Sequence, residues 1–214
     1  MSDTSRFIDI TQPFSSSLPV WPGDVPVVTN RTYGVSTISE LRLSSHVGTH
    51  VDAPAHFLRG AGTVDRMAPD VLIGPAWLVA LSHVSIVTAA DLQAAGIPAE
   101  VERVLIATRN SALWQERYAA NRLEFDPTYV SLDPSAAEWL VRRKVRLLGV
   151  DAPSIDPFGT EGFPVHHILL RANMAIIENL ALAGVAPGPY RLVCLPLLYQ
   201  DGDGAPARVV LERI

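Results

Sequence analysis

Residues 76–107 read AWLVALSHVSIVTAADLQAAGIPAEVERVLIA, and this stretch decides the fold class. The apolar run at 76–84 predicts a buried strand, and a second one is predicted at 103–107. Between them, Thr88 and Asp91 form the pattern of a capping box and predict the start of a helix. A strand, a helix and a second strand in this order are typical of parallel strands joined by a crossover helix.

The same alternation continues toward the C-terminus. Asp133 followed by Pro134 is a favourable beginning for a helix that runs to about Arg143. Further strands are predicted at 129–132, 145–150, 174–177, 191–198 and 208–211, and a further helix at 166–171. Before residue 76 the chain is mostly strand and loop, with strands predicted at 7–10 and 37–44. Because no linker or repeat interrupts the chain, we expect one α/β domain over residues 1–214.

Composition narrows the function classes. With 48% apolar and 18% charged residues, a chain of 214 residues can bury a large core. Its 17 basic and 22 acidic residues give a net charge of −5, which argues against a partner that is nucleic acid or an anionic membrane. The single cysteine, Cys194, excludes an intrachain disulfide, and the N-terminus has no apolar signal segment. We therefore expect a cytoplasmic protein.

Four side chains that can bind metals lie at even positions of the sequence SHVGTHVDAPAH: His46, His50, Asp52 and His56. In an extended chain this spacing places them on one face. A straight strand would separate the first two by about 13 Å, at roughly 3.3 Å per residue. Both can reach one ion only if the chain bends between them, which Gly48 permits. A metal cluster from His46, His50 and Asp52 is the favoured hypothesis; the alternative is a polar strand face or a buried hydrogen-bond network.

A second group of ligand-type residues lies far along the chain. Glu178 ends a predicted buried strand, where a carboxylate needs a counter-charge or a metal. A salt bridge to Arg171 would meet that need, but convergence with the first cluster would complete a metal shell. One of the neighbours His166 and His167 would then be a ligand, since adjacent helical side chains point about 100° apart. Which of the two it is stays open.

The segment HVGTHVDAPAHF at 46–57 resembles the HxGTHxDxPxH signature of the cyclase family of metal-dependent hydrolases, which includes bacterial kynurenine formamidase. Further similar segments follow in the same order over nearly the whole chain. They are DITQP at 9–13, PVWPGD at 19–24, GVDAPSID at 149–156, HHILL at 166–170, IENL at 177–180, LPL at 195–197 and DGAPAR at 203–208.

The resemblance implies a fold of the swivelling β/β/α type, which usually forms a homodimer or a larger homo-oligomer. It also implies that His46, His50 and Asp52 bind a first metal and that Asp52 bridges to a second. His166 and Glu178 match the remaining ligands. One or two zinc ions are the expected cofactor, with manganese as an alternative. Nitrogen and carboxylate donors in this ratio suit either metal and would be unusual for calcium.

The resemblance further implies an enzyme that hydrolyses an aromatic amide, favouring N-formylkynurenine, which would give kynurenine and formate. A divalent ion activates water and polarises a carbonyl. His56 matches the proton-transferring histidine of the family and could pass a proton to the leaving nitrogen. Trp21 matches the tryptophan that contacts substrate, although simple loop packing would also explain it.

Two other functions compete with this one. A hydrolase of a cyclic amide such as isatin would carry the same metal motif, and a non-catalytic metal-binding protein could use the same fold. A purely structural protein would bind no metal at all. We expect the turn residues Asp151, Ser154 and Asp156 and the strand residue His83 to be structural. The polar stretch 109–126 is a candidate lining of the substrate pocket.

Overall fold

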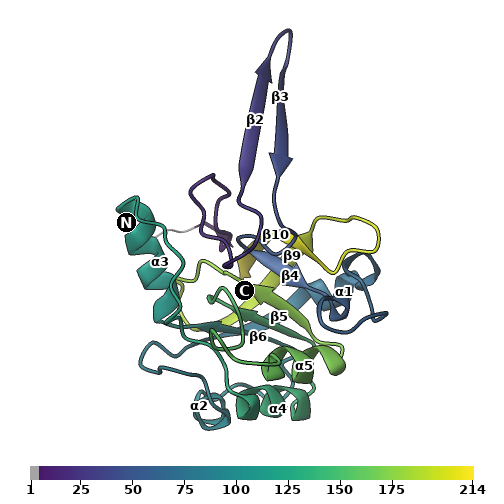
Figure 1. Cartoon of the computed structure of the whole chain (residues 1–214). Coiled ribbons are helices and arrows are strands. Elements are labelled where there is room, and N and C mark those ends of the chain that lie inside the picture. Colours follow the sequence, from purple (N-terminus) through teal and green to yellow (C-terminus); the bar gives the residue numbers. More distant parts are fainter. Residues whose placement is uncertain (1–4) are drawn as a thin grey trace.

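A closed ring of strands forms the centre of the computed structural model, which describes residues 5–214 (Figure 1). The strands are β1 (Phe7–Asp9), β4 (His50–Asp52), β5 (Ile73–Ala80), β6 (Arg103–Ala107), β7 (Leu147–Val150), β8 (Ala175–Glu178), β9 (Gly188–Pro196) and β10 (Gly204–Arg213). The ring order is β10-β4-β8-β7-β6-β5-β9, closed by pairing of β9 with β10, and β1 pairs with residues 210–212 of β10, beyond the part that pairs with β4. The pairs β5–β6, β6–β7 and β7–β8 are parallel, so the predicted mixed α/β fold is confirmed.

Helices cover one side of this ring. The longer ones near the parallel strands are α2 (Ala89–Ala94), α4 (Pro134–Arg142) and α5 (Pro164–Arg171), which lie together below the sheet in Figure 1. The predicted capping box of Thr88 and Asp91 begins α2. Asp133 caps α4 by accepting a hydrogen bond from the backbone of Ala136. The shorter elements are η1 (Pro54–His56), η2 (Val64–Arg66) and α1 (Pro69–Leu72). In the described part of the chain, no helix has the length and apolar content needed to span a membrane.

Two hydrophobic cores lie on opposite faces of the strands. Neighbouring strand residues point to opposite sides, so Leu147 packs inside the ring while Leu148 packs against the helices. Ile177 and Ile176 divide in the same way. All seven strands of the ring supply residues to the inner core. The alternation of β4 and β8 between these faces decides where their polar side chains lie.

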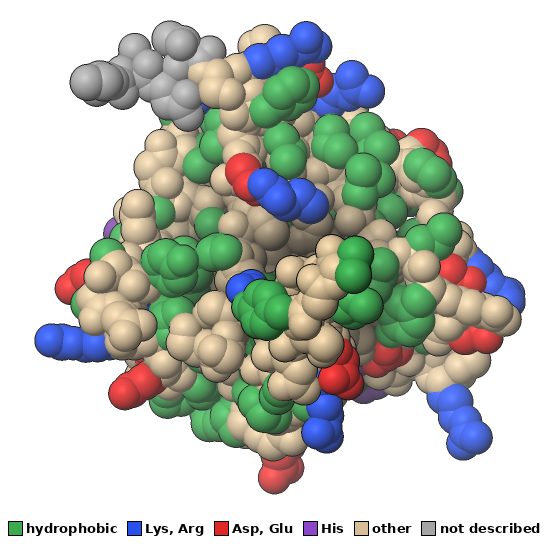
Figure 2. All heavy atoms as spheres, turned by 90° about the horizontal axis from the view of Figure 1, so that it is seen from above, with side chains coloured by type: hydrophobic (Ala, Val, Ile, Leu, Met, Phe, Trp, Pro, Cys, Tyr) green, Lys and Arg blue, Asp and Glu red, His purple; other side chains and the backbone are tan. Residues whose placement is uncertain are grey.

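A two-stranded hairpin projects from the body of the molecule (Figure 1). It consists of β2 (Val28–Tyr33) and β3 (Thr37–Arg42), and every residue of both strands is exposed. The sequence predicted the second strand but not the first, because VTNRTY has no apolar alternation. Figure 2 views this side of the molecule and shows hydrophobic side chains scattered among polar ones.

Two sequence predictions in the middle of the chain are wrong. Residues 129–132 do not form a strand; only Leu132 makes a bridge, to Val87. The side-chain amide of Asn110 takes the place of a neighbouring strand: its Nδ2 donates to the carbonyl of Val130, and its Oδ1 accepts from the amide of the same residue, both at 2.8 Å. His83 lies in an exposed turn after β5 rather than within the strand.

The polar stretch 109–126 also contains a helix that the sequence analysis did not predict, α3 (Arg109–Ala119). Its N-cap is Thr108, whose hydroxyl accepts from the amide of Asn110. The helix follows β6 directly and stands beside the first part of the chain in Figure 1. Its position places it against the cavity described below.

Candidate metal centre

Pairing of β4 with β8 brings the two predicted ligand groups together. The register sets His50 directly opposite Glu178. Val51 points into the inner core, so His50 and Asp52 point to the outer face of the ring. The predicted convergence of distant segments is therefore present, and its cause is strand register.

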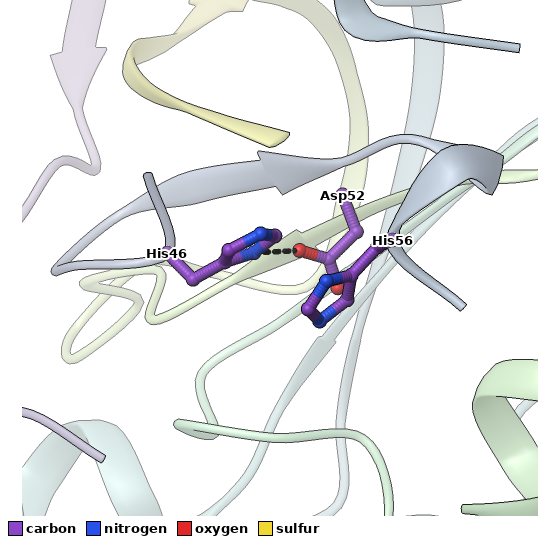
Figure 3. Close-up of side chains that lie close together, drawn as sticks. All are labelled: His46, Asp52 and His56. Atoms are coloured by element: carbon purple, nitrogen blue, oxygen red, sulfur yellow. Dashed lines mark hydrogen bonds and ion pairs between the residues drawn. The ribbon is translucent and has the colours of Figure 1, made fainter. Parts of the chain in front are cut away.

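The predicted bend in front of β4 is present as well. Gly48 has φ of 58°, a left-handed conformation that costs a glycine little. The carbonyl of Gly48 accepts a hydrogen bond of 2.8 Å from Nδ1 of His50, which turns Nε2 of that ring toward the carboxylates. The bend also returns His46 to Asp52, where its Nδ1 lies 2.7 Å from Oδ1 (Figure 3).

The first turn of α5 supplies another ring. Asp156 accepts hydrogen bonds from the backbone amides of Val165 and His166 and contacts Nδ1 of His166 at 2.6 Å. The free Nε2 of His166 is thereby aimed at the carboxylates. His167 lies outside the cluster, and its buried Nδ1 has no hydrogen-bond partner within the described chain. Asp156 was expected only to fix a turn; it also orients this ring.

The geometry fits a divalent cation. Nε2 of His50 lies 3.3 Å from Oδ1 of Asp52 and 3.4 Å from Oε2 of Glu178. Nε2 of His166 lies 3.5 Å from Oδ2 of Asp52 and 3.4 Å from Oε1 of Glu178. These separations exceed usual hydrogen bonds of about 2.7–3.2 Å, yet ligands of one tetrahedral ion at about 2.1 Å lie roughly 3.4 Å apart. Oδ2 of Asp52 is buried and has no hydrogen-bond partner among the described residues.

The electrostatics favour positive charge at the same place. Asp52 and Glu178 are both buried, and the ion pairs of their carboxylates within the described chain are with histidines. Burial opposes charge on His50, but the negative charge of the two adjacent carboxylates outweighs it and raises the pKa of His50 to about 10. Burial likewise opposes charge on Asp52, yet contacts with the rings of His166, His46 and His50 hold its pKa well below the usual value. Two adjacent buried carboxylates of this kind suit a cation.

Two histidines and an aspartate form the exposed side of the cluster. The ring of His56 stacks on that of His46 with centroids 3.8 Å apart, and Figure 3 shows both beside Asp52. Asp203 lies 2.9 Å from Nε2 of His46 and 3.5 Å from Nδ1 of His56. It immediately precedes Gly204, which pairs with Asp52 across β10 and β4. In the sequence this aspartate begins the segment DGAPAR, but no role in the site was predicted for it.

A cavity opens over the cluster. His50, His56, His166 and Glu178 line its base, and Trp21 forms part of its wall. The indole packs edge-on against aromatic rings of the neighbouring loops, with centroids 5.3 Å from Phe125 and 5.4 Å from Phe158. Trp21 therefore lies where contact with a bound molecule is possible, and loop packing holds it there.

Comparison with known proteins is consistent with this site. The family model described as "Putative cyclase" matches residues 8–157. The chain is 36% identical over 213 residues to a kynurenine formamidase of Geobacillus thermodenitrificans, covering 97% of this chain and 98% of that protein. A solved structure described as a potential metal-dependent hydrolase with cyclase activity is 32% identical, with a TM-score of 0.83 and coverage of 97% and 98%. Isatin hydrolase A of Ralstonia solanacearum is 26% identical, with a TM-score of 0.81 and coverage of 96% and 91%.

Proposed function

Because the chain belongs to the cyclase family, we propose that it is a metal-dependent hydrolase that cleaves N-formylkynurenine to kynurenine and formate. The observation that carries the proposal is the convergence of two distant segments on Asp52, which keeps one buried carboxylate oxygen without a hydrogen bond in the described chain. The name and similarity of the formamidase relative support the substrate, and the metal-dependent neighbour supports the metal.

We propose that His46, His50, Asp52, His166 and Glu178 hold one or two zinc ions, with manganese as the alternative. The histidine nitrogens and buried carboxylate oxygens around Asp52 support this assignment. A bound divalent cation polarises a carbonyl and lowers the pKa of water. Hydrogen bonds from His50 to Gly48 and from His166 to Asp156 fix which ring nitrogen faces the site.

His56 and Trp21 would act on the substrate itself. His56 is half-buried at the open side of the cluster, so its ring can reach both water and a leaving nitrogen. We propose that it carries the proton that the departing amine needs. Trp21 would form an apolar wall against the aromatic ring of the substrate, a role that its place in the cavity supports.

A panel of two amides tests the proposed function. Protein stripped of metal with a chelator should not turn over N-formylkynurenine, and added zinc or manganese should restore activity, followed by absorbance of kynurenine. The likeness to isatin hydrolase A favours cyclic amide hydrolysis as the second candidate. Turnover of isatin alone would replace the first proposal by the second. Metal binding without turnover of either amide would indicate a non-catalytic protein.

We also propose one domain that assembles into a homodimer or larger homo-oligomer. The single ring of strands supports one domain. The hairpin supports assembly, because a lone two-stranded hairpin is marginally stable in water, and Tyr33, Ile38 and Leu41 are exposed on it. Location in the cytoplasm stays a prediction of the sequence.

Charges placed on the hairpin should disrupt this assembly. The double variant Tyr33→Lys, Ile38→Lys is expected to have a lower molar mass than the wild type in light scattering coupled to size exclusion. A single exposed change elsewhere, Glu138→Lys on α4, serves as the control for added charge. A wild-type protein that is already monomeric, or a double variant of unchanged mass, would contradict a hairpin interface.

A further inference from the structure

A second cavity lies next to the one over the metal cluster. Trp21, His46 and Pro153 line both, so the two spaces adjoin at the indole of Trp21. The far wall of the second cavity belongs to α3 and to the loop that follows it. A molecule held at the metal cluster can therefore extend past Trp21 into this space.

One face of α3 is built to line the second cavity. Asn110, Leu113, Trp114 and Arg117 follow the i, i+3, i+4, i+7 spacing of a helix face, and all four line it. The buried carboxylate of Asp151 fixes the start of the helix by accepting hydrogen bonds from the backbone amides of Thr108 at 2.7 Å and Ser111 at 3.0 Å. Trp114 and Arg117, about one and two turns into the helix, are thereby fixed relative to the sheet.

The lining combines an apolar interior with charged groups. Trp21, Trp114 and Phe125 supply aromatic surface, and Nε1 of Trp114 is a buried donor without a hydrogen-bond partner in the described chain. Arg117 and Asp126 form an ion pair of 2.8 Å. Cavities of this kind orient a ligand by a few polar groups while apolar walls supply contact area.

Arg117 keeps donors for a ligand. The ion pair with Asp126 engages one terminal nitrogen, whereas a guanidinium has five N–H donors. Burial works to raise the pKa of Asp126, but hydrogen bonds from Thr128 and Arg117 outweigh it and hold the pKa below its usual value. The exposed residue Glu124 also lines this cavity. One cation and two acidic residues thus line the same cavity as the aromatic side chains.

We propose that the second cavity binds the charged end of the substrate, an α-amino acid group, with Arg117 holding its carboxylate. This assignment rests on the proposed function. Arg117 would make the enzyme prefer aryl formamides that carry an α-amino acid group. Arg117 contributes a planar array of donors that matches a carboxylate, and the acidic residues suit the ammonium. A substrate without the charged chain would fill only the cavity over the metal cluster.

Three formamides test the proposal in the metal-loaded enzyme: N-formylkynurenine, the analogue that has the carboxylate but lacks the amine, and 2-formamidoacetophenone, which has neither charge. Arg117→Met is expected to raise KM roughly 10- to 50-fold for the two substrates with a carboxylate. The value of kcat/KM for 2-formamidoacetophenone should stay within about twofold of the wild type. Arg117→Lys should restore part of the difference. Exposed Arg122, outside the cavity, supplies the matched control Arg122→Met.

Binding provides a second readout. Kynurenine should bind wild-type protein more tightly than 2-aminoacetophenone in calorimetry, and Arg117→Met should remove that difference. Equal losses for all three formamides, with a lower Tm, would show that the ion pair with Asp126 is only structural. No effect on any of them would also overturn the proposal. If the wild type hydrolyses none of the three, the proposed function itself fails and this assignment with it.

Discussion

Asp52→Asn is expected to leave a folded protein that binds no divalent metal and has lost about 10³-fold or more in kcat/KM, since metal polarisation supplies several kcal/mol. The carboxylate lies between the rings of His46, His50 and His166 and is buried. Asparagine keeps the volume and one carbonyl oxygen but removes the charge that would hold a cation. Elemental analysis of the purified variant measures the metal, and hydrolysis of N-formylkynurenine measures the rate.

The control for this variant is Glu138→Gln on the exposed face of α4, where the loss of one surface ion pair should change neither quantity. If Asp52→Asn fails to fold, Glu178→Gln tests the same prediction from the neighbouring strand, because both carboxylates face the same rings. Full metal content together with full activity in either variant would contradict the proposed centre.

Much of this centre could be predicted because its signal is local. Even spacing in HVGTHVDAPAH predicts an extended chain with one bend; Gly48 provides the bend, and His50 and Asp52 share a face of β4. The extended conformation does not continue to the other two residues, because His46 lies in a turn and His56 ends η1. The proximity of this segment to Glu178 could not be predicted from a local pattern, because it depends on the register of β4 against β8. Resemblance to a family supplied that long-range information where hydrophobic periodicity could not.

What could not be predicted depends on contacts between distant side chains. Asp203 reaches His46 only because β10 pairs with β4, and in the sequence it is one more aspartate between glycines. Residues 129–132 have the composition of a strand, yet the backbone of Val130 is hydrogen-bonded to the side-chain amide of Asn110 and not to a neighbouring strand. Helix α3 was not predicted because the face that it turns inward lines a cavity and includes polar residues. Its sequence therefore shows only a weak helical periodicity of apolar residues.

The second large effect is expected at His56, where replacement by alanine should lower kcat by about 10²- to 10⁴-fold while the metal stays bound. The ring stands at the open side of the cluster, stacked on His46 and within 3.5 Å of Asp203. If its function is to carry a proton to the leaving nitrogen, imidazole added to His56→Ala should recover part of the rate. Metal content and steady-state kinetics, with and without imidazole, are the measurements.

His83→Ala is the matched control, because that histidine is exposed in a turn outside the metal-site cavity and its loss should leave the rate unchanged. Loss of metal in parallel with loss of activity in His56→Ala would identify the ring as a ligand instead, an arrangement that its proximity to His46 and Asp52 would allow. Retained metal with imidazole rescue separates the two roles, since a free base can replace a proton carrier but cannot restore a step that lacks its cation. The distinction matters for the substrate as well: an amide nitrogen leaves only when protonated, so the enzyme needs both functions in one cavity.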